Sequence, residues 1–285
     1  MNYRYVEEPS LLFGRNQHIC PKAGIADYNP YDINNVRPEK IITGIIGKSE
    51  SIDKVCAWLK SAEKEVAAKP AKKGKRQNLR LFPGFPGFNK QTAFLCELAY
   101  DDSYLRSINN SDFDNIISSH EGLQERIAAV ADLYLNELKY LSKNKTPNVI
   151  LCVLSEDFME FITKAVLEEK YQDDDDGESV NLYADKNEEE DEVVELEQNF
   201  RRYLKAKAMQ YGVPIQIVRD RIANPNSEMQ DPATIAWNFF TAIYYKAGGV
   251  PWALVRKDMA ETTCYAGISF FKSRDKKLMQ TSIAQ

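Results

Sequence analysis

The sequence holds few of the residues from which catalytic and metal centres are usually built. Its two histidines, His18 and His120, are too few for a histidine-rich metal centre. The five cysteines are odd in number and widely spread, and four of them lie in apolar stretches. This pattern predicts small buried thiols, with no disulfide framework and no zinc site. The sequence also lacks the usual hydrolase signatures, because it contains no G-x-S-x-G elbow and no H-E-x-x-H helix.

Long hydrophobic runs are also missing. No apolar stretch approaches the roughly 18 residues that a membrane-spanning helix needs, and the start, Met1 to Tyr5, lacks the basic and apolar regions of a signal peptide. We therefore expect a soluble, cytoplasmic protein. With 285 residues, 44% of them hydrophobic, the chain can bury a core as one large domain or as two. Disorder along the whole chain is excluded.

The net charge of −5 is unevenly distributed. Residues 172–198 contain thirteen acidic side chains and a single base, Lys186, so we interpret about 171–198 as an acidic insertion. Such runs are most often solvated, which predicts that Tyr171 to Asn187 is mobile and dispensable for folding; a tether or a shield over a basic groove is the alternative. The stretch from Lys69 to Arg80 is predicted to be an exposed basic loop, for which solubilisation and phosphate contact are equally open.

Strand-like and helix-like segments alternate along the chain. The β-branched run Ile41 to Ile46 predicts a strand, and Ser49 provides an N-cap for the helix that follows. Val149 to Leu154 has no polar face, which is typical of a strand in the middle of a parallel sheet. Further strands are expected at Thr92–Cys96 and Val213–Val218, and further helices at Leu123–Leu141, Asn199–Gln210 and Pro232–Lys246. The alternation predicts an α/β fold, a Rossmann-like domain with a parallel sheet.

The same pattern divides the chain into three parts. Residues 1–39 contain four prolines and short apolar pieces, and we expect an extended, linker-like arm with turns. Residues 40–250 form the α/β domain. Residues 251–285 are expected to contain a hairpin of strands, at about 264–271 and 278–284, which is too small to fold alone.

Four residues in the second half form the most informative combination. Arg201 and Lys205 are four residues apart and share one helix face. Gln216 is expected near the carboxyl end of the next strand, where ligands collect in open α/β sheets, and Lys246 closes the following helix. Cations and an amide that converge in this way can hold a terminal phosphate. The alternative is an ordinary set of surface cations.

Several runs of the sequence resemble prokaryotic Argonautes, and together they cover nearly the whole chain. The runs similar to the linker and first MID strand of that family are Glu7 to Gly14, Ala23 to Asp32, and Gly44 to Gly47 followed by Ser51-Ile52. The runs similar to its MID-to-PIWI junction are Ala236 to Trp252, AWNFFTAIYYKAGGVPW, and Thr263 to Phe270, TCYAGISF. Because the chain opens at this linker, it resembles the short prokaryotic Argonautes, with MID at 40–250 and the beginning of a PIWI domain at 251–285.

The resemblance implies binding of a guide strand, which can be RNA or DNA, and of a complementary target. The pocket for the guide 5′-phosphate would be formed by Arg201, Lys205, Gln216 and Lys246. The loop from Arg219 to Gln230 would surround the first guide base, with Arg219 and Arg221 as contacts. No firm cofactor is implied, although the family pattern leaves room for Mg²⁺ beside the phosphate. The implied protein partner, in prokaryotic immunity, is an effector with an APAZ-like region and a TIR, sirtuin-like or nuclease domain.

Two departures from the family bear on activity. Ser269 stands where slicing members carry a metal-binding aspartate, and a hydroxyl cannot replace that anionic ligand in a two-metal site. The chain also stops at Gln285, so we expect either a fragment of a longer protein or a severely truncated member. We therefore expect guide binding without cleavage, with any enzymatic output in a partner.

Two other functions are weighed against this one. A MID-like domain can act as a protein-interaction scaffold that binds no nucleic acid. A nucleotide-binding enzyme would need a glycine-rich first turn, and Gly47-Lys48-Ser49 does not supply one, because the glycine that a phosphate loop requires five residues earlier is Ile42.

Overall fold

The computed structural model describes residues 8–68, 70, 82–173, 186–224, 230–255, 267–272 and 279–284. The chain divides into two compact units, residues 1–253 and 254–285. Four short elements precede the main sheet: β1 (Leu11–Leu12), β2 (Gln17–His18), α1 (Pro21–Tyr28) and the 3-10 turn η1 (Tyr31–Asn34). The first strand of the sheet, β3 (Lys40–Gly47), follows. The remaining elements of the first unit are α2 (Ser49–Ser61), β4 (Glu97–Ala99), η2 (Asp102–Tyr104), β5 (Leu105–Ser107), α3 (Asn110–Ile117), α4 (Leu123–Asn144), β6 (Val149–Leu154), α5 (Glu156–Asp173), α6 (Lys186–Ala208), η4 (Met209–Tyr211), β7 (Ile215–Arg219), η5 (Asp220–Ala223) and α7 (Pro232–Lys246).

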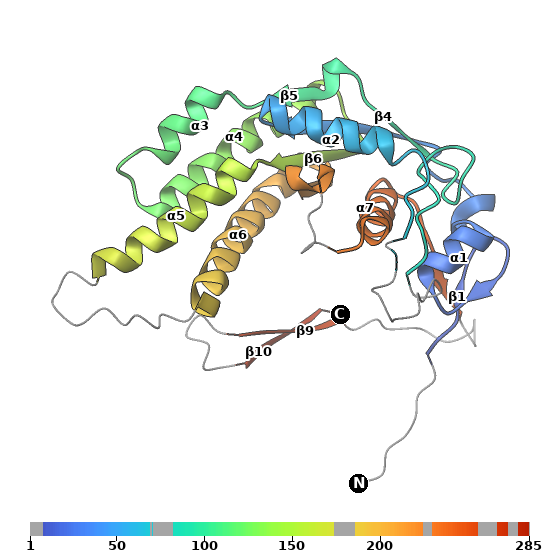
Figure 1. Ribbon diagram of the computed structural model, residues 1–285. Coiled ribbons are helices and arrows are strands. Elements are labelled where there is room, and N and C mark those ends of the chain that lie inside the picture. Colours follow the sequence, from blue (N-terminus) through green and yellow to red (C-terminus); the bar gives the residue numbers. More distant parts are fainter. Residues whose placement is uncertain are drawn as a thin grey trace, which may run out of the picture. The chain divides into compact units, whose positions relative to one another are not determined.

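A parallel sheet forms the centre of the first unit (Figure 1). Its strands lie in the order β4-β3-β6-β7, and β5 pairs with the second half of β3. The strands β3, β6 and β7 run parallel, with Gly44 opposite Ile150 and Ile150 opposite Ile215. The predicted α/β class with a parallel sheet is therefore confirmed. Pro214 precedes β7, which is an edge strand in this order, as expected for a strand that follows a proline.

The central strand β6 is buried on both faces, as its lack of a polar face predicts. Val149, Leu151 and Val153 pack with residues of α2 and α7 and of the N-terminal segment. The alternate residues Ile150, Cys152 and Leu154 pack with α3, α4, α5 and α6. Helices therefore cover both faces of the sheet, which is the layered arrangement of doubly wound α/β proteins (Figure 1).

Three local predictions are wrong. The segment 1–39 is not only an extended arm with turns, because Pro21 opens the helix α1 at a position where proline needs no hydrogen-bond donor. Ser49 is the first helical residue of α2 and not its cap; Lys48 precedes the helix without a capping side-chain hydrogen bond. Thr92–Cys96 is a turn. Leu95 has a left-handed φ of 50° and donates its N–H to the Thr92 carbonyl, and the strand begins only at Glu97.

The described residues of the predicted acidic insertion, 171–173 and 186–198, are helical. The helix α6 already begins at Lys186, and α5 continues to Asp173, so both ends of the segment 171–198 are helical. Residues 174–185, on which most of the predicted mobility falls, lie outside the described residues, as does nearly all of the basic loop 69–80. The mobility of this segment stays a prediction.

The second unit contains a two-stranded antiparallel pairing. The strands β9 (Gly267–Lys272) and β10 (Met279–Ala284) pair along their whole length, and Ser269 lies opposite Ser282. The short strand β8 (Ala253–Leu254) lies at the boundary between the units. Among the described residues, no helix is long and apolar enough to cross a membrane.

Candidate anion-binding site

The site begins with a stripe of charged residues on α6. Phe200 and Leu204 anchor this helix in the buried cluster that also contains residues of α4 and α5. Beside that buried face, Glu197, Arg201 and Lys205 follow one another at intervals of four residues, so one stripe of the helix carries all three side chains. The predicted proximity of Arg201 and Lys205 is thus realised, and a carboxylate precedes them.

Glu197 holds two guanidinium groups. Its side chain is buried, with 6% of the residue exposed. One carboxylate oxygen accepts hydrogen bonds from Nε of Arg201 at 2.8 Å and from Nε of Arg219 at 3.1 Å, and the other accepts from Nη2 of Arg219. Burial raises the pKa of Glu197, but the hydrogen bonds from Arg219 and Arg201 outweigh it, so that the pKa lies below its usual value. The carboxylate is therefore ionised at neutral pH.

Lys246 and Gln216 form the second part of the site. Lys246 is the last residue of α7, and its Nζ donates to the backbone carbonyl of Ile215 at 2.6 Å and to Oε1 of Gln216 at 2.7 Å. Burial lowers the pKa of Lys246, and the positive charge of Lys205 lowers it further.

Both parts are attached to the edge strand β7, at different residues. Gln216 engages α7 through Lys246, and Arg219 engages α6 through Glu197. Gln216 is the second residue of β7, so its predicted place near the carboxyl end of the strand is wrong; the carboxyl end is Arg219. The site therefore extends along the edge strand from Gln216 to Arg219 and is not confined to its carboxyl end. The cause is the short strand, which begins at Ile215 after Pro214 and so leaves Gln216 at its start.

Among the described residues, four cations and one carboxylate make up the site. Arg201, Lys205, Arg219 and Lys246 give a net positive charge around Glu197. Lys205 is exposed and the others are half-buried, so an anion can reach the group from solvent. Cations that approach from three elements, with an amide beside them, suit an anionic group with several acceptor oxygens.

The predicted first-base contacts have different surroundings. Arg219 lies in the strand β7 and is held by Glu197, so it does not belong to a loop. Arg221 is exposed on the 3-10 turn η5 directly after the strand. Residues 225–229 of this segment lie outside the described residues, and the role of the segment around a base stays a prediction.

The chain is similar to known proteins in its structure but not detectably in its sequence. No family model matches the chain, and no curated protein matches it. Among solved structures it is similar to an Argonaute from Clostridium butyricum, bound to a guide DNA with a 5′ deoxycytidine and a 19-mer target DNA. The identity is 15% and the TM-score 0.48, and the match covers 98% of this chain and 28% of that chain. The chain thus spans less than a third of the length of that Argonaute.

The site does not suit a magnesium ion held by the protein. Mg²⁺ prefers carboxylate and carbonyl oxygens, and Glu197 is the carboxylate that the described part of the site contains. Both of its oxygens already accept hydrogen bonds from arginines. The remaining side chains with charge are cations that would repel a metal. Any Mg²⁺ beside a bound phosphate would have to be held by the phosphate itself.

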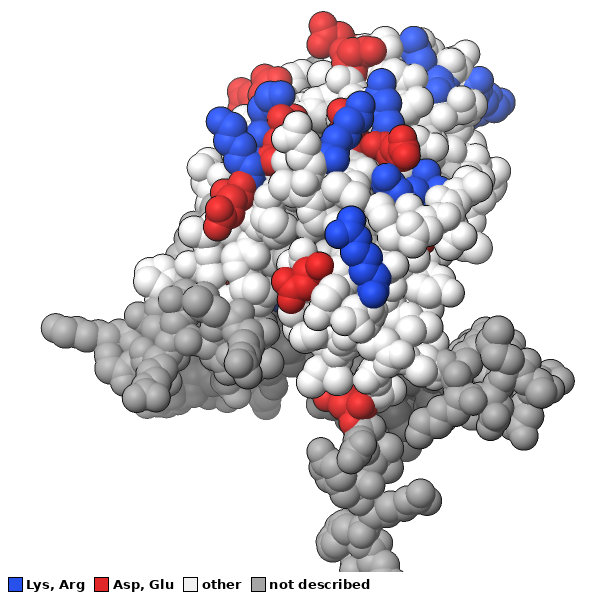
Figure 2. Space-filling view, turned by 90° about the vertical axis from the view of Figure 1, so that its right-hand side faces the viewer, with Lys and Arg blue, Asp and Glu red and all other residues white. Residues whose placement is uncertain are grey.

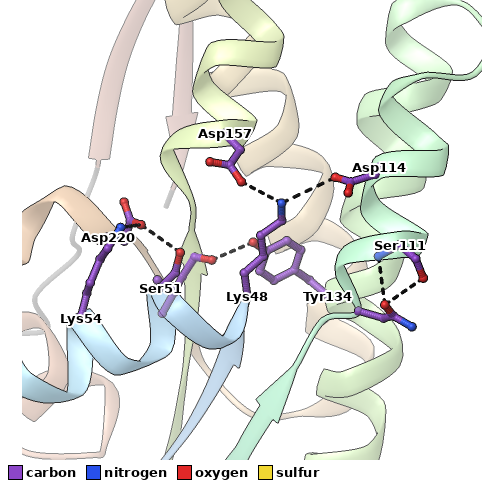
Figure 3. Close-up of polar contacts among 10 residues, drawn as sticks. Lys48, Ser51, Lys54, Ser111, Asp114, Tyr134, Asp157 and Asp220 are labelled. Atoms are coloured by element: carbon purple, nitrogen blue, oxygen red, sulfur yellow. Dashed lines mark hydrogen bonds and ion pairs between the residues drawn. The ribbon is translucent and has the colours of Figure 1, made fainter.

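The carboxyl edge of the sheet is occupied by the chain's own contacts (Figure 3). Lys48, which directly follows β3, places its Nζ 2.8 Å from Oδ2 of Asp157 and 4.0 Å from the ring centre of Phe113, and Asp114 lies at 3.9 Å. This lysine is buried and paired, so it is not the free cation of a phosphate loop. The absence of that loop, predicted from Ile42, agrees with these contacts.

A second network joins α2 to the turn after β7 (Figure 3). Asp220 is 2% exposed, and its Oδ2 accepts a hydrogen bond from Ser51 at 2.9 Å and from Lys54 at 3.1 Å. The hydrogen bond and the charge of Asp220 raise the pKa of Lys54. This buried contact fixes the start of η5, and with it the end of β7 at Arg219.

An apolar groove lies elsewhere in the first unit. It has a volume of about 630 Å³ and is lined by α1 and α7 and by residues 250–252, with Trp237, Tyr245 and Trp252 as the aromatic residues.

On the side of the molecule that faces the viewer in Figure 2, the described basic and acidic side chains are interleaved and form no patch of a single sign. The described residues on that face therefore form no continuous basic path for a nucleic acid.

Proposed function

We propose that this chain binds the 5′-phosphorylated end of a nucleic-acid guide at the free edge of β7. The observation that carries the proposal is that Arg201 and Lys205 on α6, Gln216 on β7 and Lys246 on α7 belong to three elements that are tied together by hydrogen bonds at one edge strand. Their shared position is what a pocket for a terminal phosphate requires, and it is the set that the sequence resemblance assigns to this role.

The chemistry of the site supports a doubly charged phosphate. Lys205 and Lys246 have no acidic partner among their described contacts, and their mutual repulsion is relieved when an anion lies between them. A bound phosphate favours the charged form of Lys246 and raises its lowered pKa. Arg201 adds N–H groups of fixed direction, and Gln216 adds a neutral amide.

The finer assignment is that of a short prokaryotic Argonaute subunit that does not cut its target. Guide loading and target pairing then signal to an effector partner with an APAZ-like region, in defence against invading nucleic acid. What supports the lack of cleavage is Ser269, because a hydroxyl is a poor substitute for the carboxylate that a two-metal site needs. Guides of RNA and of DNA are both compatible with a site that contacts phosphate.

The test compares guides that differ only in their 5′ end. Lys205→Glu should weaken binding of a 5′-phosphorylated 18-nucleotide strand by about 10- to 100-fold, because a charge-assisted contact is replaced by repulsion. The same strand with a 5′-hydroxyl should be affected far less. Lys207→Glu is the matched control: it makes the same charge change on an exposed residue of the same helix, where Lys207 lies over the ring of Tyr203. Equal losses for both guides would place the phosphate elsewhere.

A protein-interaction scaffold is the second candidate, and the apolar groove between α1 and α7 is the observation that favours it. Exposed Tyr245 and Val250 lie at this groove, where a partner could cover them. A titration with a labelled 5′-phosphorylated RNA, and with the DNA of the same sequence, separates the two functions. A scaffold would bind neither strand at physiological salt.

A further inference from the structure

A buried carboxylate in the middle of an anion-binding site needs a physical reason. Glu197 repels an incoming phosphate, and burying its charge is costly unless the charge is paired. The residue faces Arg201 and Arg219, which could meet a phosphate directly if the carboxylate were absent. Its benefit must therefore lie in what it does to these two guanidinium groups.

The hydrogen bonds define that effect. Both contacts of Arg201 with the carboxylate use Nε and Nη2, at 2.8 and 2.7 Å from the same oxygen. These atoms form one side of the guanidinium group, so Nη1 is turned away from Glu197. Arg219 uses Nε and Nη2 as well, in a two-pronged contact that is the strongest geometry for this pair of groups. The carboxylate thus fixes the planes of two flexible side chains at once.

The arginines and the lysines of the site differ in whether their charge is paired. Glu197 compensates the charge of the arginines, whereas Lys205 and Lys246 lack such a partner among their described contacts. Repulsion from one carboxylate is therefore outweighed by the lysines, and the phosphate still meets a net positive site. The arginines therefore contribute to the ligand mainly through the N–H groups that Glu197 does not use, and these groups point in a fixed direction.

We propose that Glu197 is a positioning residue of the phosphate site, which holds the guanidinium group of Arg201 so that its Nη1 side faces a terminal phosphate. This inference rests on the proposed function, because it concerns the same ligand. Preorganisation lowers the entropy that Arg201 loses on binding, and this gain applies to the phosphate group and not to the rest of the strand. Glu197 therefore contributes to the discrimination between 5′-phosphate and 5′-hydroxyl.

The measured quantity is a ratio of dissociation constants. The Kd of the 5′-hydroxyl strand divided by the Kd of the 5′-phosphorylated strand is determined by fluorescence anisotropy at one salt concentration for each variant. Glu197→Asp keeps the charge but shortens the side chain, so it cannot reach both arginines, and Glu197→Gln keeps the length but loses the charge. We expect both to lower the ratio by about tenfold, the effect of one charged hydrogen bond.

A double-mutant cycle separates positioning from a purely structural role. Arg201→Ala should lower the ratio by a similar factor, and adding Glu197→Gln to it should lower the ratio no further, because both changes remove the same contact. Arg219→Gln, which leaves Glu197 paired with Arg201, is a variant for the case that Glu197→Gln does not fold; it should lower the ratio by less than Arg201→Ala does.

Three outcomes overturn the inference. If Glu197→Asp discriminates like the wild type and Glu197→Gln binds both strands more tightly, the residue acts only through its charge. If the variants lower the melting temperature but leave the ratio unchanged, it acts only in folding. Additive effects of Glu197→Gln and Arg201→Ala would show that the two residues act separately. A wild-type ratio near one would instead refute the proposed function, whatever the variants do.

Discussion

Replacing Lys246 by methionine separates the stability of the site from its binding. Methionine keeps most of the apolar stem of lysine and removes the charge, so packing at the end of α7 should change little. In the wild-type protein, Nζ donates to the Ile215 carbonyl at 2.6 Å and to Gln216 at 2.7 Å, while burial and the charge of Lys205 disfavour the ammonium form. In the free protein the hydrogen bonds stabilise the ammonium group of Lys246, whereas burial and the charge of Lys205 destabilise it. In the phosphate complex the bound anion offsets the destabilising effects.

The magnitudes follow from these contacts. Two hydrogen bonds from a charged donor are worth about 1.5 to 3 kcal/mol each, and removing a partly buried charge beside another cation recovers a penalty of several kcal/mol. We expect the free energy of unfolding of Lys246→Met to differ from that of the wild type by less than about 1.5 kcal/mol at neutral pH. Affinity for a 5′-phosphorylated strand should fall by about 10- to 100-fold, because nothing offsets the lost contact there.

The lowered pKa of Lys246 determines how stability should change with pH. The pKa of Lys246 in the folded protein lies below the 10.5 of an unperturbed lysine. Between those two values the unfolded chain binds a proton that the folded chain does not, so stability rises with pH. Wild-type stability relative to Lys246→Met should therefore be constant well below the lowered pKa and rise as the pH moves through it toward 10.5. Phosphate affinity should fall over the same interval.

Urea unfolding at several pH values, together with anisotropy titrations, measures both effects. Lys207→Met is the control, because it makes the same substitution at an exposed lysine of α6 that contacts the ring of Tyr203 and no residue of the site. A loss of more than about 3 kcal/mol at neutral pH in Lys246→Met would refute the balance proposed here, since the hydrogen bonds would then outweigh the burial of the charge. A relative stability that falls with rising pH would refute it as well.

Two further predictions concern the arm and the second unit. Gly24→Ala should destabilise the protein by about 1 to 3 kcal/mol in urea unfolding, because a Cβ atom there would overlap the ring of buried Phe13; Phe13→Leu should recover part of the loss, and no loss would mean that the arm shifts freely. Ser269→Asp should produce no guide-directed cleavage with Mg²⁺ or Mn²⁺, because one carboxylate does not build a two-metal site; a single product of defined length on a sequencing gel, from either form, would contradict this.

The sequence by itself determined the layered fold. Val149 to Leu154 has no polar face, and a strand of that kind is stable only where helices cover both sides, which is where β6 lies. The period of α4 and the proline that opens α7 likewise determined two of the helices. The turn at Thr92–Cys96 was missed because its β-branched and aromatic residues favour a strand, and a distant side chain, Arg37, binds the Leu95 carbonyl outside the sheet.

The site was determined by sequence only in part. Spacing on one helix places Arg201 and Lys205 together, and the same spacing of four extends back to Glu197, a signal that its place in an acidic run concealed. Whether Arg219 meets that carboxylate, and whether Lys246 meets Gln216, depends on α6 and α7 lying on opposite faces of an edge strand. Hydrogen bonds of 3.1 and 2.7 Å between residues 22 and 30 apart in the sequence require packed helices, and only the tertiary structure fixes that packing.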